Sequence, residues 1–132
     1  MIALDTNVIV RFLVRDDEKQ AQAVYARFRA AEAARERLFV PLVVVLETIW
    51  VLESAYALSR EDTLDALDDL RRMAILEFES EAVLQGVLSD GRRCAAGLAD
   101  LLIAHSAGAA GCSSGITFDK KAAKLPFFRL LQ

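Results

Sequence analysis

Short apolar segments alternate along the chain with longer segments in which apolar residues follow helical spacing. A strand buried in a parallel sheet reads as a short apolar run, and a helix that covers the sheet reads as a periodic segment. The alternation therefore predicts an α/β domain with a mainly parallel sheet of four to five strands. The predicted strands are Ile2–Leu4, which is expected to be buried, Leu38–Val40, Ala74–Phe78, Ile116–Phe118 and Phe128–Leu131.

Capping signals divide the remaining sequence into helices. Acidic residues at 16–18 open the second helix, as the helix dipole favours, and Pro41 suits the first turn of the third. Gly111 closes the last helix, whereas Gly91 is expected to interrupt the chain before it. The predicted helices are Thr6 to about Leu13, Asp16 to about Arg35, Pro41 to about Leu58, Ser59–Arg72, Ser80 to about Leu88 and Leu98–Ala110.

Composition predicts one globular domain over residues 1–132. Hydrophobic residues make up 55% of the chain, which excludes a disordered tail. The longest apolar stretch, Pro41–Leu58, is interrupted by Glu47 and Glu53, so no membrane span is expected. The N-terminus lacks a basic segment, and Cys94 and Cys112 lack metal-type spacing, which predicts a cytoplasmic protein with reduced thiols.

Two acidic residues directly follow predicted strands. Asp5 ends the first apolar run, and Asp119 ends the fourth, with Thr117 two residues earlier. In parallel α/β sheets, ligands bind at the carboxyl ends of the strands, so both acids lie where a site is expected. The alternative for each is a helix N-cap, for the helix from Thr6 or for a short helix over Lys120–Lys124.

Two more acidic residues interrupt apolar helical segments. Helical spacing places Glu47 on an apolar stripe, which implies a buried carboxylate, whereas Glu53 is expected to face solvent. Asp100 lies within a similar apolar segment. A buried carboxylate is costly unless a cation or strong donors compensate it. The alternatives are an ion pair between Glu47 and an arginine, and a first-turn or backbone-satisfied role for Asp100.

Taken together, these four carboxylates predict a metal site. Closely spaced carboxylates stay ionised only with cations, and oxygen ligands suit Mg²⁺ or Mn²⁺, which can promote phosphodiester hydrolysis. No cysteine–histidine set resembles a zinc site, and the sequence has neither a phosphate-binding glycine loop nor a nucleophile elbow. His105, the only histidine, is expected on another helix face from Asp100.

Four motifs in order give the sequence a family resemblance. They are Leu4-Asp5-Thr6-Asn7-Val8-Ile9-Val10, Glu47-Thr48-Ile49-Trp50-Val51-Leu52, Ala99-Asp100-Leu101-Leu102-Ile103-Ala104 and Thr117-Phe118-Asp119-Lys120-Lys121. With these four motifs in this order, the whole chain resembles the PIN-domain family, and specifically the VapC-type toxins of toxin–antitoxin pairs.

The resemblance implies a three-layer α/β/α fold, usually as a homodimer, and endoribonuclease activity that needs Mg²⁺ or Mn²⁺. It implies that Asp5, Glu47, Asp100 and Asp119 carry the metal and the catalysis, and that a cognate antitoxin protein blocks the site. Neighbouring side chains would orient ligands or water; these are Thr6, Asn7 and Thr117. One departure is Gly97, where family members often have a further acid, so the number of metals stays open.

An RNA substrate also requires positive charge, although the net charge is −3. Phosphate binding must then rely on metals or on local basic groups. The candidates that rim the predicted site are Arg11, Arg15, Lys120, Lys121 and Lys124, with Arg92 and Arg93 in a predicted loop. The candidate dimer surface comprises the apolar helices around Trp50 and Leu64–Leu70.

Two alternative functions remain. A phosphatase of the haloacid-dehalogenase type also places an aspartate after its first strand, but it needs a second aspartate where this chain has Asn7. A partner-binding module could keep the fold without catalysis, although all four acids are present.

Overall fold

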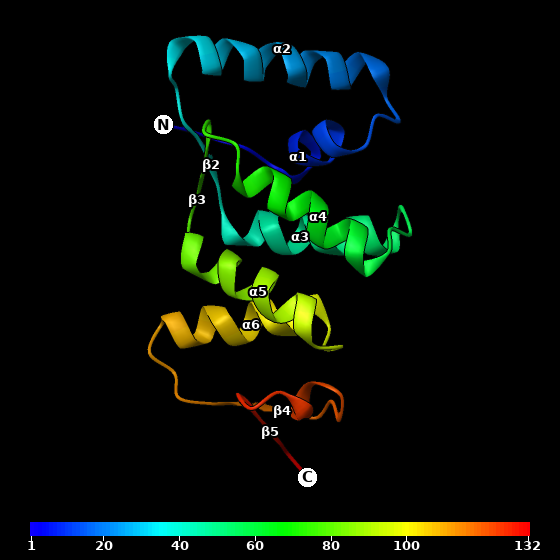
Figure 1. The fold of residues 1–132 in the computed structure, drawn as a ribbon, viewed down its shortest axis with the longest axis vertical. Coiled ribbons are helices and arrows are strands. Elements are labelled where there is room, and N and C mark those ends of the chain that lie inside the picture. Colours follow the sequence, from blue (N-terminus) through cyan, green and yellow to red (C-terminus); the bar gives the residue numbers. More distant parts are fainter. The chain divides into compact units, whose positions relative to one another are not determined.

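In the computed structural model, which describes residues 1–132, the chain forms two units, Met1–Glu81 and Ala82–Gln132. Each unit contains helices and parallel strands, as Figure 1 shows from blue to red along the chain. The α/β class and the parallel pairing predicted from the sequence are confirmed. The five strands are divided between a three-stranded sheet in the first unit and a two-stranded sheet in the second.

The sheet of the first unit has the strand order β1-β2-β3, with every pair parallel. Its strands are β1 (Ile2–Ala3), β2 (Leu38–Val40) and β3 (Leu76–Phe78). The central strand buries Leu38 and Val40, as predicted. The expectation of a buried first strand was wrong, because β1 lies at the edge of this sheet and Ile2 remains 53% exposed. Only Leu4, just beyond β1, is buried.

Four helices accompany this sheet, and side-chain caps fix the start of three of them. Asp5 accepts a hydrogen bond from the Val8 N–H, Asp17 from Gln20 and Ser59 from Asp62, so that each satisfies a free N–H of a first turn. The helices are α1 (Thr6–Leu13), α2 (Glu18–Ala34), α3 (Leu42–Ser54) and α4 (Arg60–Arg71).

Helix α3 ends earlier than the sequence predicted. The apolar pattern continues to Leu58, but the helix stops at Ser54. Ala57 adopts a left-handed conformation with φ 51°, and the Leu58 N–H donates to the Leu52 carbonyl at 3.0 Å. This bond reverses the chain toward the Ser59 cap. Because left-handed positions usually carry glycine, the alanine gave no signal of the turn.

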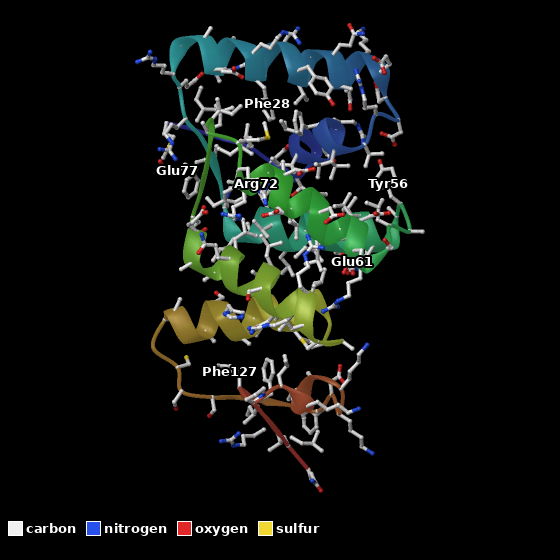
Figure 2. All side chains as sticks on the ribbon, in the orientation of Figure 1. Phe28, Tyr56, Glu61, Arg72, Glu77 and Phe127 are labelled. Carbon is white, nitrogen blue, oxygen red and sulfur yellow. The ribbon has the colours of Figure 1, made fainter.

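The core of the first unit lies among its helices. Phe28 points from α2 toward α1 in Figure 2, and its ring lies 5.0 Å from that of Phe12. The leucines Leu64, Leu67 and Leu70 of α4 are at most 1% exposed, so they are core residues and the prediction of a dimer surface there was wrong. Trp50 is 65% exposed and stays available for contacts.

The second unit contains two helices, two strands and a 3₁₀ turn. Its elements are α5 (Glu81–Arg93, beginning at the unit boundary), α6 (Leu98–Ala109), β4 (Gly115–Thr117), η1 (Ala122–Lys124) and β5 (Phe128–Leu130). The predicted break at Gly91 was wrong, because this residue is buried inside α5. Arg92 and Arg93 therefore end a helix instead of lying in a loop. Gly111 follows α6 with φ 99°, as its predicted role requires.

Neither cysteine forms a disulfide, and both are exposed. None of the helices combines the length and the apolar composition that a bilayer-spanning segment needs.

Candidate functional site

Asp5 stands between the first strand and the first helix. Its Oδ1 accepts a hydrogen bond from the Val8 N–H at 3.1 Å, so the N-cap alternative is correct as a description of its geometry. The carboxylate is nevertheless exposed, and its Oδ2 forms no hydrogen bond or ion pair. An N-cap that uses one oxygen fixes the rotamer of the carboxylate and leaves the other oxygen available to a ligand.

Glu47 reaches the start of the first helix through Thr6. The Thr6 hydroxyl donates a hydrogen bond to Oε1 of Glu47, and Thr6 itself is buried. Because Thr6 directly follows Asp5, this bond brings α3 to the helix start that Asp5 caps. Asn7, the next residue, is exposed.

The prediction that Glu47 is buried was wrong. Helix α3 buries the face that contains Val44, Thr48 and Ile49, whereas Glu47 lies on the exposed face beside Val43. Both faces carry apolar side chains, so periodicity in the sequence could not show which one faces the core. Glu47 also forms no ion pair with an arginine, which removes that alternative. Its exposed carboxylate is accessible to a ligand.

Asp100 lies in the second unit, in the first turn of α6, where the dipole favours an acid. This matches one of the alternatives considered for it. The helix begins after Gly97, and a Cβ at that position would lie 3.1 Å from Oδ2 of Asp100. Glycine therefore keeps one side of this half-buried carboxylate clear, where any other residue would press on it.

Asp119 follows β4 and organises the turn before η1. Its Oδ1 accepts hydrogen bonds from the N–H groups of Lys121 at 2.8 Å and Ala122 at 3.4 Å. Its own N–H donates to the Thr117 hydroxyl at 3.0 Å. The carboxylate is exposed, and its capping role near η1 matches the alternative considered for it.

Of the four carboxylates, Asp5 and Glu47 belong to the first unit, and Asp100 and Asp119 belong to the second. No group of three or more aspartate, glutamate, histidine or cysteine side chains in the structure could hold a metal ion. The chemistry of the donors fits a hard cation, because all four side chains present carboxylate oxygens and none is a soft ligand. The meeting of all four at one metal stays a prediction.

Among the basic candidates, Arg11 is already hydrogen-bonded to three side chains of the first unit. Its guanidinium donates to Gln20 at 2.7 Å, to Tyr56 at 3.1 Å and to Asp16 at 3.3 Å. The Tyr56 hydroxyl, in the segment that follows α3 (Figure 2), donates to Asp16 at 2.6 Å. This hydrogen bond, aided by Arg11, lowers the pKa of Asp16. No pattern in the sequence indicated this network. Arg15, Lys120, Lys121 and Lys124 are exposed.

His105 pairs with an acid that the sequence did not single out. Its Nε2 lies 2.7 Å from Oδ2 of Asp90 on α5, and Arg93 donates to the other oxygen at 2.9 Å. The hydrogen bond with His105, aided by Arg93, lowers the pKa of Asp90. The pair lines a mostly apolar pocket of about 460 Å³ that also includes Leu101 and Phe127. No local sequence signal links positions 90 and 105, because the contact arises from helix packing.

Comparison with known proteins places these observations in a family. The sequence profile described as the PIN domain matches residues 2–128, a range that includes both units and all four carboxylates. The "VapC ribonuclease" of Aquifex aeolicus (strain VF5) is 25% identical over 127 residues, which cover 96% of this chain and 93% of that relative. The profile match spans nearly the whole chain, and the parallel α/β elements agree with it. The chain belongs to the PIN domain family, as its motifs indicated.

Proposed function

We propose that the protein is a metal-dependent endoribonuclease of the VapC type, acting as the toxin of a toxin–antitoxin pair. The family match and the ribonuclease relative support this assignment. The observation that carries it is the hydrogen bond from Thr6 to Glu47. Thr6 directly follows Asp5, so this bond links Glu47 to the helix start that Asp5 caps, and Asp5 and Glu47 are both predicted metal ligands. Residues 1–132 would then form a single nuclease domain from both units.

In this proposal Asp5, Glu47, Asp100 and Asp119 hold Mg²⁺ or Mn²⁺. The bound ion supplies Lewis acidity for phosphodiester hydrolysis. The chain itself orients the carboxylates. Thr6 holds one oxygen of Glu47, the Val8 N–H holds one oxygen of Asp5, and the backbone of Lys121 and Ala122 holds Asp119.

Three further features of the proposal come from the family resemblance. The substrate is RNA, the cognate antitoxin is a protein that blocks the site, and the toxin is a homodimer. The cytoplasmic location is carried over from the sequence. The exposed Trp50 on α3 is a surface that a second copy or the antitoxin could cover. Asn7 and Thr117 would orient ligands or water beside the carboxylates.

The test is cleavage of total cellular RNA by purified protein in Mg²⁺, Mn²⁺ or EDTA. Asp5→Asn should abolish cleavage, because it removes a predicted ligand while keeping the N-cap oxygen. Glu53→Gln is the matched control, since Glu53 is an exposed acid on α3 outside the site. Cleavage that needs metal and survives only in the control supports the nuclease.

Intact RNA in every reaction, with retained binding of an antitoxin, would instead favour a partner-binding module. Hydrolysis of a phosphomonoester without RNA cleavage would favour the phosphatase.

A further inference from the structure

A basic recess lies on the first unit, outside the proposed metal site. Helix α2 and the residues before it enclose about 400 Å³ lined by Arg15, Gln22, Tyr25 and Arg29. Gln22, Tyr25 and Arg29 are spaced by three and four residues, so they share one side of the helix. None of these four lining residues is acidic.

Tyr25 gives the recess a fixed wall. Its hydroxyl donates to the Phe12 carbonyl at 3.0 Å, and its ring lies 5.1 Å from the Phe12 ring. The guanidinium of Arg15 stacks over the Tyr25 ring, 4.7 Å from its centroid. A stacked guanidinium keeps its planar fork of N–H donors available at its edge, and stacking limits its conformational freedom.

Arg29 completes the recess one turn further along α2. It is exposed and forms no hydrogen bond or ion pair in the structure. Arg27, on the same helix, contrasts with it, because both of its terminal nitrogens bind Glu36, at 2.8 and 2.9 Å. The two arginines therefore differ in availability and not in formal charge.

Glu18 is the acid nearest the lining groups. It accepts from Arg15 at 3.4 Å and from Gln22 at 3.2 Å through the same oxygen, Oε1. The Arg15–Glu18 pair is more than half exposed on both sides, and exposed pairs contribute little to stability. An incoming anion could thus take over both donors at small cost.

We propose that this recess binds a phosphodiester group of single-stranded RNA and so holds the substrate at a distance from the proposed catalytic site. The inference rests on the proposed nuclease function. The two guanidinium groups and the Gln22 amide offer several N–H donors, which match the several oxygens of a phosphate. Glu18 is the one acid that competes for these donors. The RNA backbone also carries a phosphodiester group at every nucleotide. A net charge of −3 makes a local unpaired arginine necessary for this contact.

The test measures RNA binding separately from cleavage. The full chain carrying Asp5→Asn is titrated, in EDTA, against a fluorescein-labelled single-stranded RNA of mixed sequence, between about 50 and 200 mM salt. Arg15→Gln and Arg29→Gln are each added to this background. Arg27→Gln is the matched control, because it removes the same formal charge from α2, the helix that also carries Arg29. Circular dichroism confirms that each variant is folded.

Each recess variant should raise the Kd about fivefold at 0.1 M salt, because one phosphate contact on a single strand contributes about 0.7 to the log–log salt slope. The slope itself should fall by about 0.7 per arginine. Arg27→Gln should bind as the parent does, and Glu18→Gln should bind more tightly because it removes the competing carboxylate.

Kd values and slopes of Arg15→Gln and Arg29→Gln equal to those of the parent would overturn the inference, as would a parent that does not bind RNA. A polyglutamate probe that depends on both arginines while RNA does not would reassign the recess to an acidic protein segment. Cleavage by the wild-type chain in Mn²⁺ separates the two proposals. Cleavage without arginine-dependent binding rejects only the recess, and arginine-dependent binding without cleavage rejects only the nuclease.

Discussion

The Thr6 hydroxyl donates a hydrogen bond to Oε1 of Glu47, a residue 41 positions further along the chain. Thr6 is buried at the first position of α1, and Glu47 is exposed on α3. The bond therefore joins two helices and holds one oxygen of a carboxylate whose other oxygen faces solvent. It makes Thr6 a positioning residue for a proposed metal ligand.

Replacing Thr6 with valine should lower the affinity for Mn²⁺ and kcat/KM for RNA by about 10-fold to 100-fold, as loss of a hydrogen bond to a metal ligand commonly does. Valine keeps the shape of threonine and removes only the hydroxyl. Thr6→Ser, which keeps the hydroxyl, should restore Mn²⁺ affinity. Equal Mn²⁺ binding by Thr6→Val and wild type would remove the positioning role.

Thr48→Val should raise the free energy of unfolding by about 1 kcal/mol, because a buried hydroxyl without a partner costs about that much. The Thr48 hydroxyl is buried on α3 and has no hydrogen-bond partner, and the residue is 1% exposed. Urea denaturation of wild type and variant measures the difference. A lower stability of the variant would mean that the hydroxyl is satisfied in solution.

Gly86→Ala should destabilise the protein by about 1–3 kcal/mol, although alanine favours helices, because overpacking outweighs helix propensity. A Cβ at Gly86 would lie 2.4 Å from Nδ1 of His105. The same substitution in a His105→Ala background should be neutral or stabilising. Denaturation of the four proteins in this double-mutant cycle gives the coupling, and additive effects would contradict the packing of α5 against His105.

Acid should destabilise wild type more than Asp90→Asn. The hydrogen bond with His105 lowers the pKa of Asp90 in the folded state, so the pair contributes stability above the unfolded carboxyl pKa of about 3.9. This contribution is lost as the pH falls from there through the lowered folded pKa. Thermal denaturation between about pH 5 and pH 2 should show a steeper loss in wild type. Parallel curves would show that Asp90 has the same pKa in both states.

Much of the local structure could be predicted because capping and strand signals are short-range. Asp5 and Asp119 follow strands as expected, and both also cap the next turn. Features that depend on packing could not be predicted. The two apolar faces of α3 do not reveal that Glu47 is exposed, and the buried Gly91 gives no sign that α5 continues through it.

The left-handed Ala57 shows a further reason why the sequence falls short. A residue with φ 51° that is not glycine carries no sequence mark, so the end of α3 could be found only from the structure. The hydrogen bonds of Arg11 with Tyr56 and of His105 with Asp90 are likewise set by tertiary contact. Sequence patterns thus located the candidate acids but not the interactions that orient their surroundings.

In the proposed function, carboxylates from both units hold the same metal ion. Calorimetric titration of Mn²⁺ into wild type, Asp5→Asn, Asp119→Asn and the control Glu53→Gln tests this proposal. A variant in either unit should lose the Mn²⁺ binding that wild type and the control show. Wild-type affinity in Asp5→Asn or in Asp119→Asn would contradict a site shared by the two units.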